Sequence, residues 1–133
     1  MYKLVAVDQS VATREVVLKN QVTKKIDSCF DDSALVSSTS NFEFMKIGQE
    51  YDCMVVLFGV ARNYGLGEWL ECHILDDNVK LNNVRLVKVS VDDNIYYVHR
   101  DQVPANSLNG LFMFECTRKD LYKVDDVIHQ EIY

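Results

Sequence analysis

The side chains best suited to hold a metal ion are three cysteines and two histidines in apolar or alternating segments. They are Cys53, Cys72, His73, His99 and Cys116. Structural zinc sites usually pair ligands two to four residues apart, whereas Cys72 and His73 are adjacent and would point to opposite faces of a strand. The spacing disfavours a zinc site, so we expect no metal and no cofactor. Together with Cys29, these cysteines are expected to be buried, reduced thiols.

Histidine is also a common general base, and the chain has three candidates, His73, His99 and His129. No G-x-S-x-G turn or comparable local signature surrounds a serine or cysteine. The glycines at 65 and 67 lack the third glycine and the following helix of a phosphate-binding turn. These features favour a protein that is not an enzyme, although a catalytic triad can assemble from residues far apart in the sequence.

Acidic pairs are the most distinctive polar feature of the chain. They are Asp31-Asp32, Asp76-Asp77, Asp92-Asp93 and Asp125-Asp126. One interpretation is local, because aspartate side chains bond nearby backbone amides in turns and keep a surface soluble. The other is a negative surface for a basic partner, with Asp76, Asp77, Asp92 and Asp93 gathered at one end of the fold to steer association. Beside them, an aromatic and polar rim would be formed by Tyr96, Tyr97, His99 and Arg100.

A second possible binding site lies around the glycine-containing loop. Arg62, Tyr64 and Trp69 could form a stacking platform for the bases of a single-stranded nucleic acid. The alternative is that Trp69 closes one end of the fold and Tyr64 packs on it. The acidic balance of the chain favours this structural alternative.

Short apolar runs predict the strands that must position these side chains. Residues 51–60 are apolar on both alternating faces apart from Asp52, which predicts a strand buried on both sides. The other strands are expected at 2–7, 69–75, 84–91, 95–100 and 111–116. Turns are expected at 76–78, 92–94 and 109–110, so that 84–91 and 95–100 form a hairpin.

Two segments instead carry apolar residues at helical spacing. Leu18, Val22, Ile26 and Cys29 predict a helix within 13–30, against a competing strand at 15–19. Near the C-terminus, a helix over 118–133 capped by Thr117 is predicted by Leu121, Val124, Ile128 and Ile132.

These elements predict an α+β fold. We expect a small antiparallel β-barrel or strongly curled sheet, OB-like or alternatively SH3-like, with an N-terminal and a C-terminal helix. All 133 residues are expected to form one domain, in which 1–41 supply a strand, helix and loop, 42–117 the barrel body, and 118–133 the last helix.

Composition limits the classes of function. The hydrophobic fraction of 48% suits a folded globular protein, and the first residues lack a secretory signal, which suggests a cytoplasmic protein with no membrane contact. A net charge of -6 favours a basic protein partner over nucleic acid. The leading hypothesis is a non-enzymatic inhibitor, such as an immunity protein that neutralises a basic toxin acting on nucleic acid. The alternative is an OB-like module that binds single-stranded nucleic acid or docks in a nucleoprotein assembly.

Overall fold

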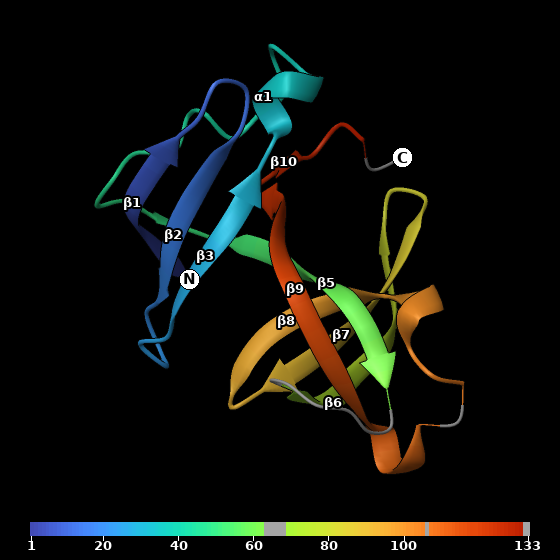
Figure 1. Cartoon of the computed structure of the whole chain (residues 1–133). Helices are drawn as coiled ribbons and strands as arrows, with labels where there is room; N and C mark the ends of the chain where they lie inside the picture. The colour runs from blue at the N-terminus through green and yellow to red at the C-terminus, as the bar shows by residue number, and fades with distance from the viewer. Residues whose placement is uncertain (63–68, 106, 132–133) are drawn as a thin grey trace.

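The computed structural model describes residues 1–62, 69–105 and 107–131, and these are mostly β-structure (Figure 1). The strands are β1 (Tyr2–Gln9), β2 (Arg14–Asn20), β3 (Ile26–Asp31), β4 (Glu50–Tyr51), β5 (Cys53–Arg62), β6 (Leu70–Leu81), β7 (Val84–Val91), β8 (Asn94–His99), β9 (Leu111–Val124) and β10 (Val127–Ile128). Helical structure in the described residues is limited to α1 (Ser33–Val36) and two 3-10 turns, η1 (Arg100–Gln102) and η2 (Leu108–Gly110). None of these helices is long and apolar enough to cross a membrane.

All ten strands belong to one mixed sheet. Its order is β4-β1-β2-β3-β9-β5-β8-β7-β6, with β10 added beside β9. Strand β9 is the junction, because it pairs with β5 along 113–124, with β6 along 111–114 and with β3 at Asp120. In Figure 1, β9 runs alongside both the N-terminal strands and the group β5 to β8. The predicted small antiparallel barrel, OB-like or SH3-like, with a helix at each end is therefore wrong.

The predicted N-terminal helix is replaced by the β2–β3 hairpin. Across it, Val16 faces Cys29 and Leu18 faces Asp27. The apparent helical stripe arises because Leu18 and Cys29 point into the core from two different strands, whereas Val22 and Ile26 are exposed at 84% and 59%. The competing strand prediction for 15–19 is correct, in agreement with the preference of β-branched residues for extended backbone.

The predicted C-terminal helix is replaced by the end of β9 and by β10. Two register shifts interrupt the pairing of β5 with β9, and they leave Thr117 and Tyr122 without a partner on β5. Such a bulge adds one residue to a strand and shifts its alternation. Leu121 and Val124 therefore both point into the core although they are three residues apart. This spacing imitates a helical period within a strand.

Most of the predicted strands are confirmed, with shifted ends. The hairpin of β7 and β8 pairs 86–91 with 94–99 around Asp92 and Asp93, whose φ angles of 49° and 67° match the type I′ turn. Strand β5 is buried on both faces only at its centre, since Val56 and Leu57 are buried while Phe58 is 45% exposed. The turn expected at 76–78 is absent, because β6 passes through it as an irregular but continuous strand.

One main core links the N-terminal strands to the rest of the sheet. It includes Leu4, Val16, Leu18, Phe42, Val55, Leu57, Val87, Val89, Val98, Phe112, Phe114 and Leu121. A smaller cluster of Val56, Leu81 and Leu86 forms on the other face of β5, and Tyr97 and Tyr122 pack against it. The two clusters therefore distinguish an inner face of the sheet around β5 from an outer face.

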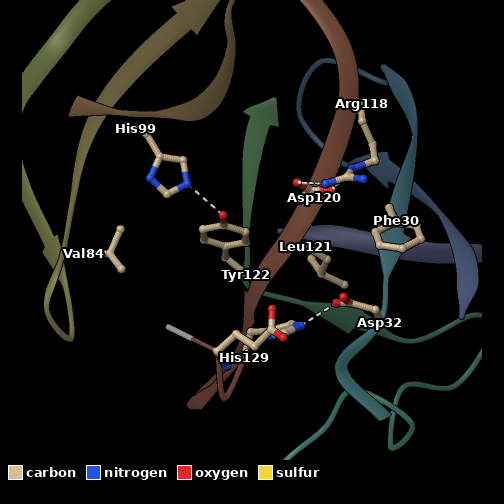
Figure 2. A pocket seen from close by; sticks show the side chains of 10 residues that line it. Phe30, Asp32, Val84, His99, Arg118, Asp120, Leu121, Tyr122 and His129 are labelled. Carbon is tan, nitrogen blue, oxygen red and sulfur yellow. Dashed lines mark hydrogen bonds and ion pairs between the residues drawn. The ribbon is translucent and has the colours of Figure 1, made fainter. Parts of the chain in front are cut away.

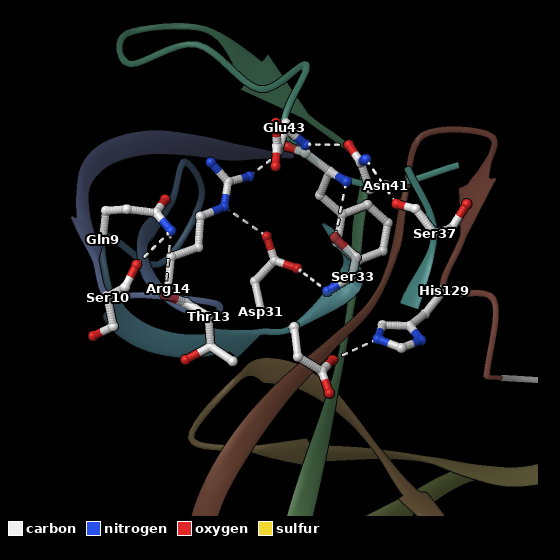
Figure 3. A network of polar contacts seen from close by, with 12 residues as sticks. Gln9, Ser10, Thr13, Arg14, Asp31, Ser33, Ser37, Asn41, Glu43 and His129 are labelled. Carbon is white, nitrogen blue, oxygen red and sulfur yellow. Dashed lines mark hydrogen bonds and ion pairs between the residues drawn. The ribbon is translucent and has the colours of Figure 1, made fainter. Parts of the chain in front are cut away.

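A polar network holds the segment that follows β3 (Figure 3). Arg14 on β2 donates from Nε to Asp31 Oδ2 at 2.7 Å and from Nη2 to the Phe42 carbonyl at 2.5 Å. Asp31 Oδ1 also accepts from the Ser33 amide, and the Ser33 hydroxyl accepts from the Phe42 amide. Because Arg14 and Asp31 are almost fully buried, this network fixes the loop that contains α1 and Phe42 against the sheet.

The buried Cys72 thiol predicts weaker stability in alkali. Burial, with a smaller contribution from Cys116, raises the pKa of Cys72 from 9.0 to about 12. Between these values the unfolded chain loses its thiol proton while the folded chain keeps it, so stability falls as the pH rises. Between pH 8 and 10, the unfolding free energy of the native chain should fall by about 1.4 kcal/mol more than that of Cys72→Ala in urea titrations. Equal falls would contradict this assignment.

Candidate functional site

The acidic pairs expected at one end of the fold lie on different elements of the structure. Asp76 and Asp77 are exposed within β6, and Asp92 and Asp93 are exposed at the β7–β8 turn. The Arg100 guanidinium contacts the Asp77 carbonyl and lies 3.8 Å from its carboxylate. Arg100 and Asp77 thus pair with each other.

The aromatic residues predicted for binding lie in different environments. Tyr96 is only 2% exposed and donates to Asp27 at 2.5 Å, so it belongs to the core and cannot form a surface rim. Tyr97 is half-buried on the outer face. Of the proposed stacking platform, Tyr64 and the side chain of Arg62 lie outside the described residues, and Trp69 is half-buried just before β6.

Two adjoining cavities of about 250 and 330 Å³ meet around Tyr97. Asp52, Cys53 and Tyr97 line both of them, Asp125 lines the first and Asp93 lines the second. We call this surface the Tyr97 groove. Two hydrogen bonds between Asp52 and Asp125 fix the rim of the groove. Asp125 Oδ1 accepts from the Asp52 amide at 2.9 Å, and the Asp125 amide donates to the Asp52 carbonyl at 2.7 Å.

Carboxylates set the electrostatic field at Tyr97. Burial raises the pKa of its phenol, and Asp52 and Asp76 raise it further, as expected when negative charges disfavour an ionised phenol. Lys88 and Lys123 also line the groove and partly offset the carboxylates. The groove thus combines predicted Asp93 and Tyr97 with Asp52 and Asp125, which were not predicted. Predicted Asp76 does not line it, because Asp76 pairs with Lys88, which in turn faces Tyr97.

A single row of paired residues connects the Tyr97 groove to a second hollow. Residues that face each other on adjacent strands have side chains on the same face of the sheet. The row runs through Asp76 on β6, Lys88 on β7, Tyr97 on β8, Val56 on β5, Asp120 on β9 and Phe30 on β3. Tyr97 in this row lines the Tyr97 groove, and Asp120 and Phe30 line the second hollow. Both hollows therefore belong to the outer face.

The second hollow is a cavity of about 200 Å³ (Figure 2), here called the His99 pocket. It is lined by Phe30, Asp32, Val84, His99, Arg118, Asp120, Leu121, Tyr122, His129 and Glu131. The bulge at Tyr122 turns its side chain toward the pocket, where it forms one wall, since bulges redirect side chains. The Tyr122 hydroxyl lies 2.8 Å from His99 Nε2, and the two rings meet edge to face.

At one side of the pocket, Asp120 balances the charge of Arg118, and its contacts hold the guanidinium in place. Its Nε and Nη2 atoms donate to the two Asp120 carboxylate oxygens at 2.6 and 3.2 Å. Its guanidinium carbon also lies 4.8 Å from the ring centre of Phe30 and 4.9 Å from that of Phe58. The hydrogen bonds to Asp120 raise the pKa of Arg118, so the guanidinium remains charged.

His129 joins the C-terminal end to the segment after β3. It is 5% exposed, and its Nδ1 accepts from the Glu131 amide at 3.2 Å. The proton must therefore sit on Nε2, which lies 2.5 Å from Asp32 Oδ1 and donates to it. Since both ring nitrogens are occupied, His129 holds structure and is not placed to accept a proton from a substrate.

The pocket therefore has groups that can bind a ligand but lacks the parts of a nucleophilic site. No serine, threonine or cysteine is among the described residues that line it. Burial, with Asp120 as the largest charged contribution, raises the pKa of Tyr122 to about 12, which keeps the phenol neutral near pH 7. Within the described ranges, no group of three or more potential metal ligands gathers, and all four cysteines are free.

Comparison with known proteins adds no functional information. No family model, curated protein or solved structure matches the chain. The residues that sequence reasoning missed are Asp32, Asp52, Asp120 and Asp125, together with Arg118. Asp32 and Asp125 belong to the acidic pairs, which were a usable signal, whereas Arg118 and Asp120 become a site only through their neighbours on other strands.

Proposed function

We propose that this chain is a non-enzymatic binding protein that occludes a basic protein partner through the Tyr97 groove. The observation that carries the proposal is that Asp52, Asp93 and Asp125 line the two cavities that meet at one half-buried tyrosine. Asp76 lies outside these cavities but raises the pKa of that tyrosine together with Asp52. Such an arrangement supplies an aromatic contact within a negative field, which speeds the association of a positive partner. An intracellular inhibitor of the immunity-protein type, acting on a basic toxin that targets nucleic acid, is the concrete form of the proposal.

The first experiment is affinity capture from the host lysate at low and physiological salt. The bait is the native chain, the triple variant Asp52→Asn/Asp76→Asn/Asp93→Asn, or the control Asp8→Asn/Glu43→Gln/Glu71→Gln. All six positions are exposed, and both variants remove three negative charges. We expect a basic protein on the native chain and on the control, and its loss from the groove variant.

The association rate of the captured protein then tests the mechanism. Neutralising the groove should lower this rate about tenfold at low salt, because steering by a local field contributes at least that factor. Equal behaviour of the groove and control variants would contradict binding through the groove. Recovery of nucleic acid in place of a basic protein would overturn the proposal.

A further inference from the structure

The His99 pocket has the size and walls of a site for a small group. Its volume of about 200 Å³ would hold roughly six waters at about 30 Å³ each. Val84 provides apolar surface, and the ring of Tyr122 provides an aromatic wall. Figure 2 shows these side chains, with Asp32 and His129, lying around one hollow. A short aliphatic stem with a polar end matches this combination.

The charges around the pocket do not cancel. Arg118 is paired with Asp120, and the geometry of His129 makes its ring the neutral form with the proton on Nε2. Two carboxylates remain, those of Asp32 and Glu131. Asp32 accepts a hydrogen bond from His129 through Oδ1, and 29% of its side chain remains exposed. Its Oδ2 makes no hydrogen bond within the described part of the chain and can accept one from a ligand.

The direction of the pKa shift at Tyr122 agrees with this charge count. After burial, Asp120 is the largest cause of its raised pKa, and Asp32 and Glu131 act in the same direction. Arg118 opposes them without cancelling the shift. The negative groups thus prevail at the phenol, which lies on the wall of the pocket.

We propose that the His99 pocket binds an organic cation, an ammonium or guanidinium group on a short aliphatic stem. The cation donates hydrogen bonds to Asp32 and Glu131, and the stem lies on Val84. The Tyr122 ring adds cation–π attraction. This site is separate from the Tyr97 groove and does not depend on the function proposed for it. A free amine and a lysine or arginine side chain of a protein share the required chemistry.

The test uses the full chain and agmatine, which carries a guanidinium and an ammonium on a four-carbon stem. Ring signals of His99 and Tyr122, followed by NMR, should shift with saturation in the millimolar range. Neutral N-butylurea and anionic glutarate should produce no saturable shift. Asp32→Asn, which keeps an oxygen for His129, and Glu131→Gln should each weaken agmatine binding about tenfold, whereas Asp8→Asn should not.

Two further arms identify the source of the cation and separate the two proposals. The blocked tripeptide acetyl-Ala-Arg-Ala-amide should compete with agmatine if the pocket accepts a protein side chain, and fail to compete if it accepts only free amines. The groove variant Asp52→Asn/Asp76→Asn/Asp93→Asn should bind agmatine normally, whatever its effect on partner capture. Three results would each overturn the proposal. They are no saturable binding at agmatine concentrations 20-fold above the expected millimolar range, binding of N-butylurea equal to that of agmatine, and unchanged agmatine affinity in both Asp32→Asn and Glu131→Gln.

Discussion

Replacement of Asp27 by alanine should lower the unfolding free energy by about 3–5 kcal/mol, the usual cost of removing one partner of a buried ion pair. Asp27 is 3% exposed and accepts hydrogen bonds from Lys119 Nζ and, at 2.5 Å, from the Tyr96 hydroxyl. Backbone pairing between β3 and β9 is limited to Phe30 with Asp120. The side chains of Asp27, Tyr96 and Lys119 therefore link β3 to β8 and β9 where the backbone does so only briefly.

Urea unfolding followed by circular dichroism measures this effect. Tyr96→Phe keeps the ring and removes one hydrogen bond to a charged group, so it should cost about 1.5–3 kcal/mol. Asp77→Ala is the control, because Asp77 is 71% exposed and its ion pair with Arg100 should contribute less than about 1 kcal/mol. A loss below 1 kcal/mol in Asp27→Ala would show that the buried pair does not hold β3 in place.

Addition of a single methyl group at Gly59 should destabilise the junction of β5 and β9. A Cβ atom there would lie 1.9 Å from the Glu115 carbonyl oxygen and 2.9 Å from its carbonyl carbon. These are backbone atoms of the neighbouring strand, so no side-chain rotation relieves the clash. Gly59→Ala should cost at least about 3 kcal/mol, the upper end of the usual range for an overpacked core.

Gly48→Ala is the matched control for this substitution. Nothing lies within 4 Å of an added Cβ at Gly48, whose φ of +93° makes any side chain unfavourable. Its expected cost is the left-handed backbone penalty of about 1–2 kcal/mol. Thermal and urea unfolding compare the two variants. A smaller loss in Gly59→Ala than in Gly48→Ala would contradict the close approach of β5 and β9.

The helical predictions failed for two identifiable reasons. In the N-terminal segment, Leu18 and Cys29 reach the core from opposite sides of a hairpin, so their regular spacing is not a property of one element. In the C-terminal segment, the bulge at Tyr122 moves Val124 onto the face that Leu121 occupies. An amphipathic helix and a bulged strand give the same local pattern, and only pairing with β5 distinguishes them.

The candidate sites were only partly visible in the sequence for a similar reason. The aspartates at 92 and 93 correctly marked a turn, since both tolerate the positive φ angles that this hairpin requires. Neither their position relative to Asp52 nor the burial of Tyr96 follows from local composition. Asp52 and Asp125 are 73 residues apart in the chain and meet through hydrogen bonds at the rim of the Tyr97 groove.

The sequence by itself determined the acidic balance, most of the strands and the β7–β8 hairpin, because alternation and turn preference act between near neighbours. Tertiary structure decided the order of the strands, the bulges and the two hollows of the outer face. The cross-strand row from Asp76 to Phe30 contains one residue from each of six strands, so no local window of sequence contains it. These residues become a surface because burial of the apolar core aligns their strands in one register.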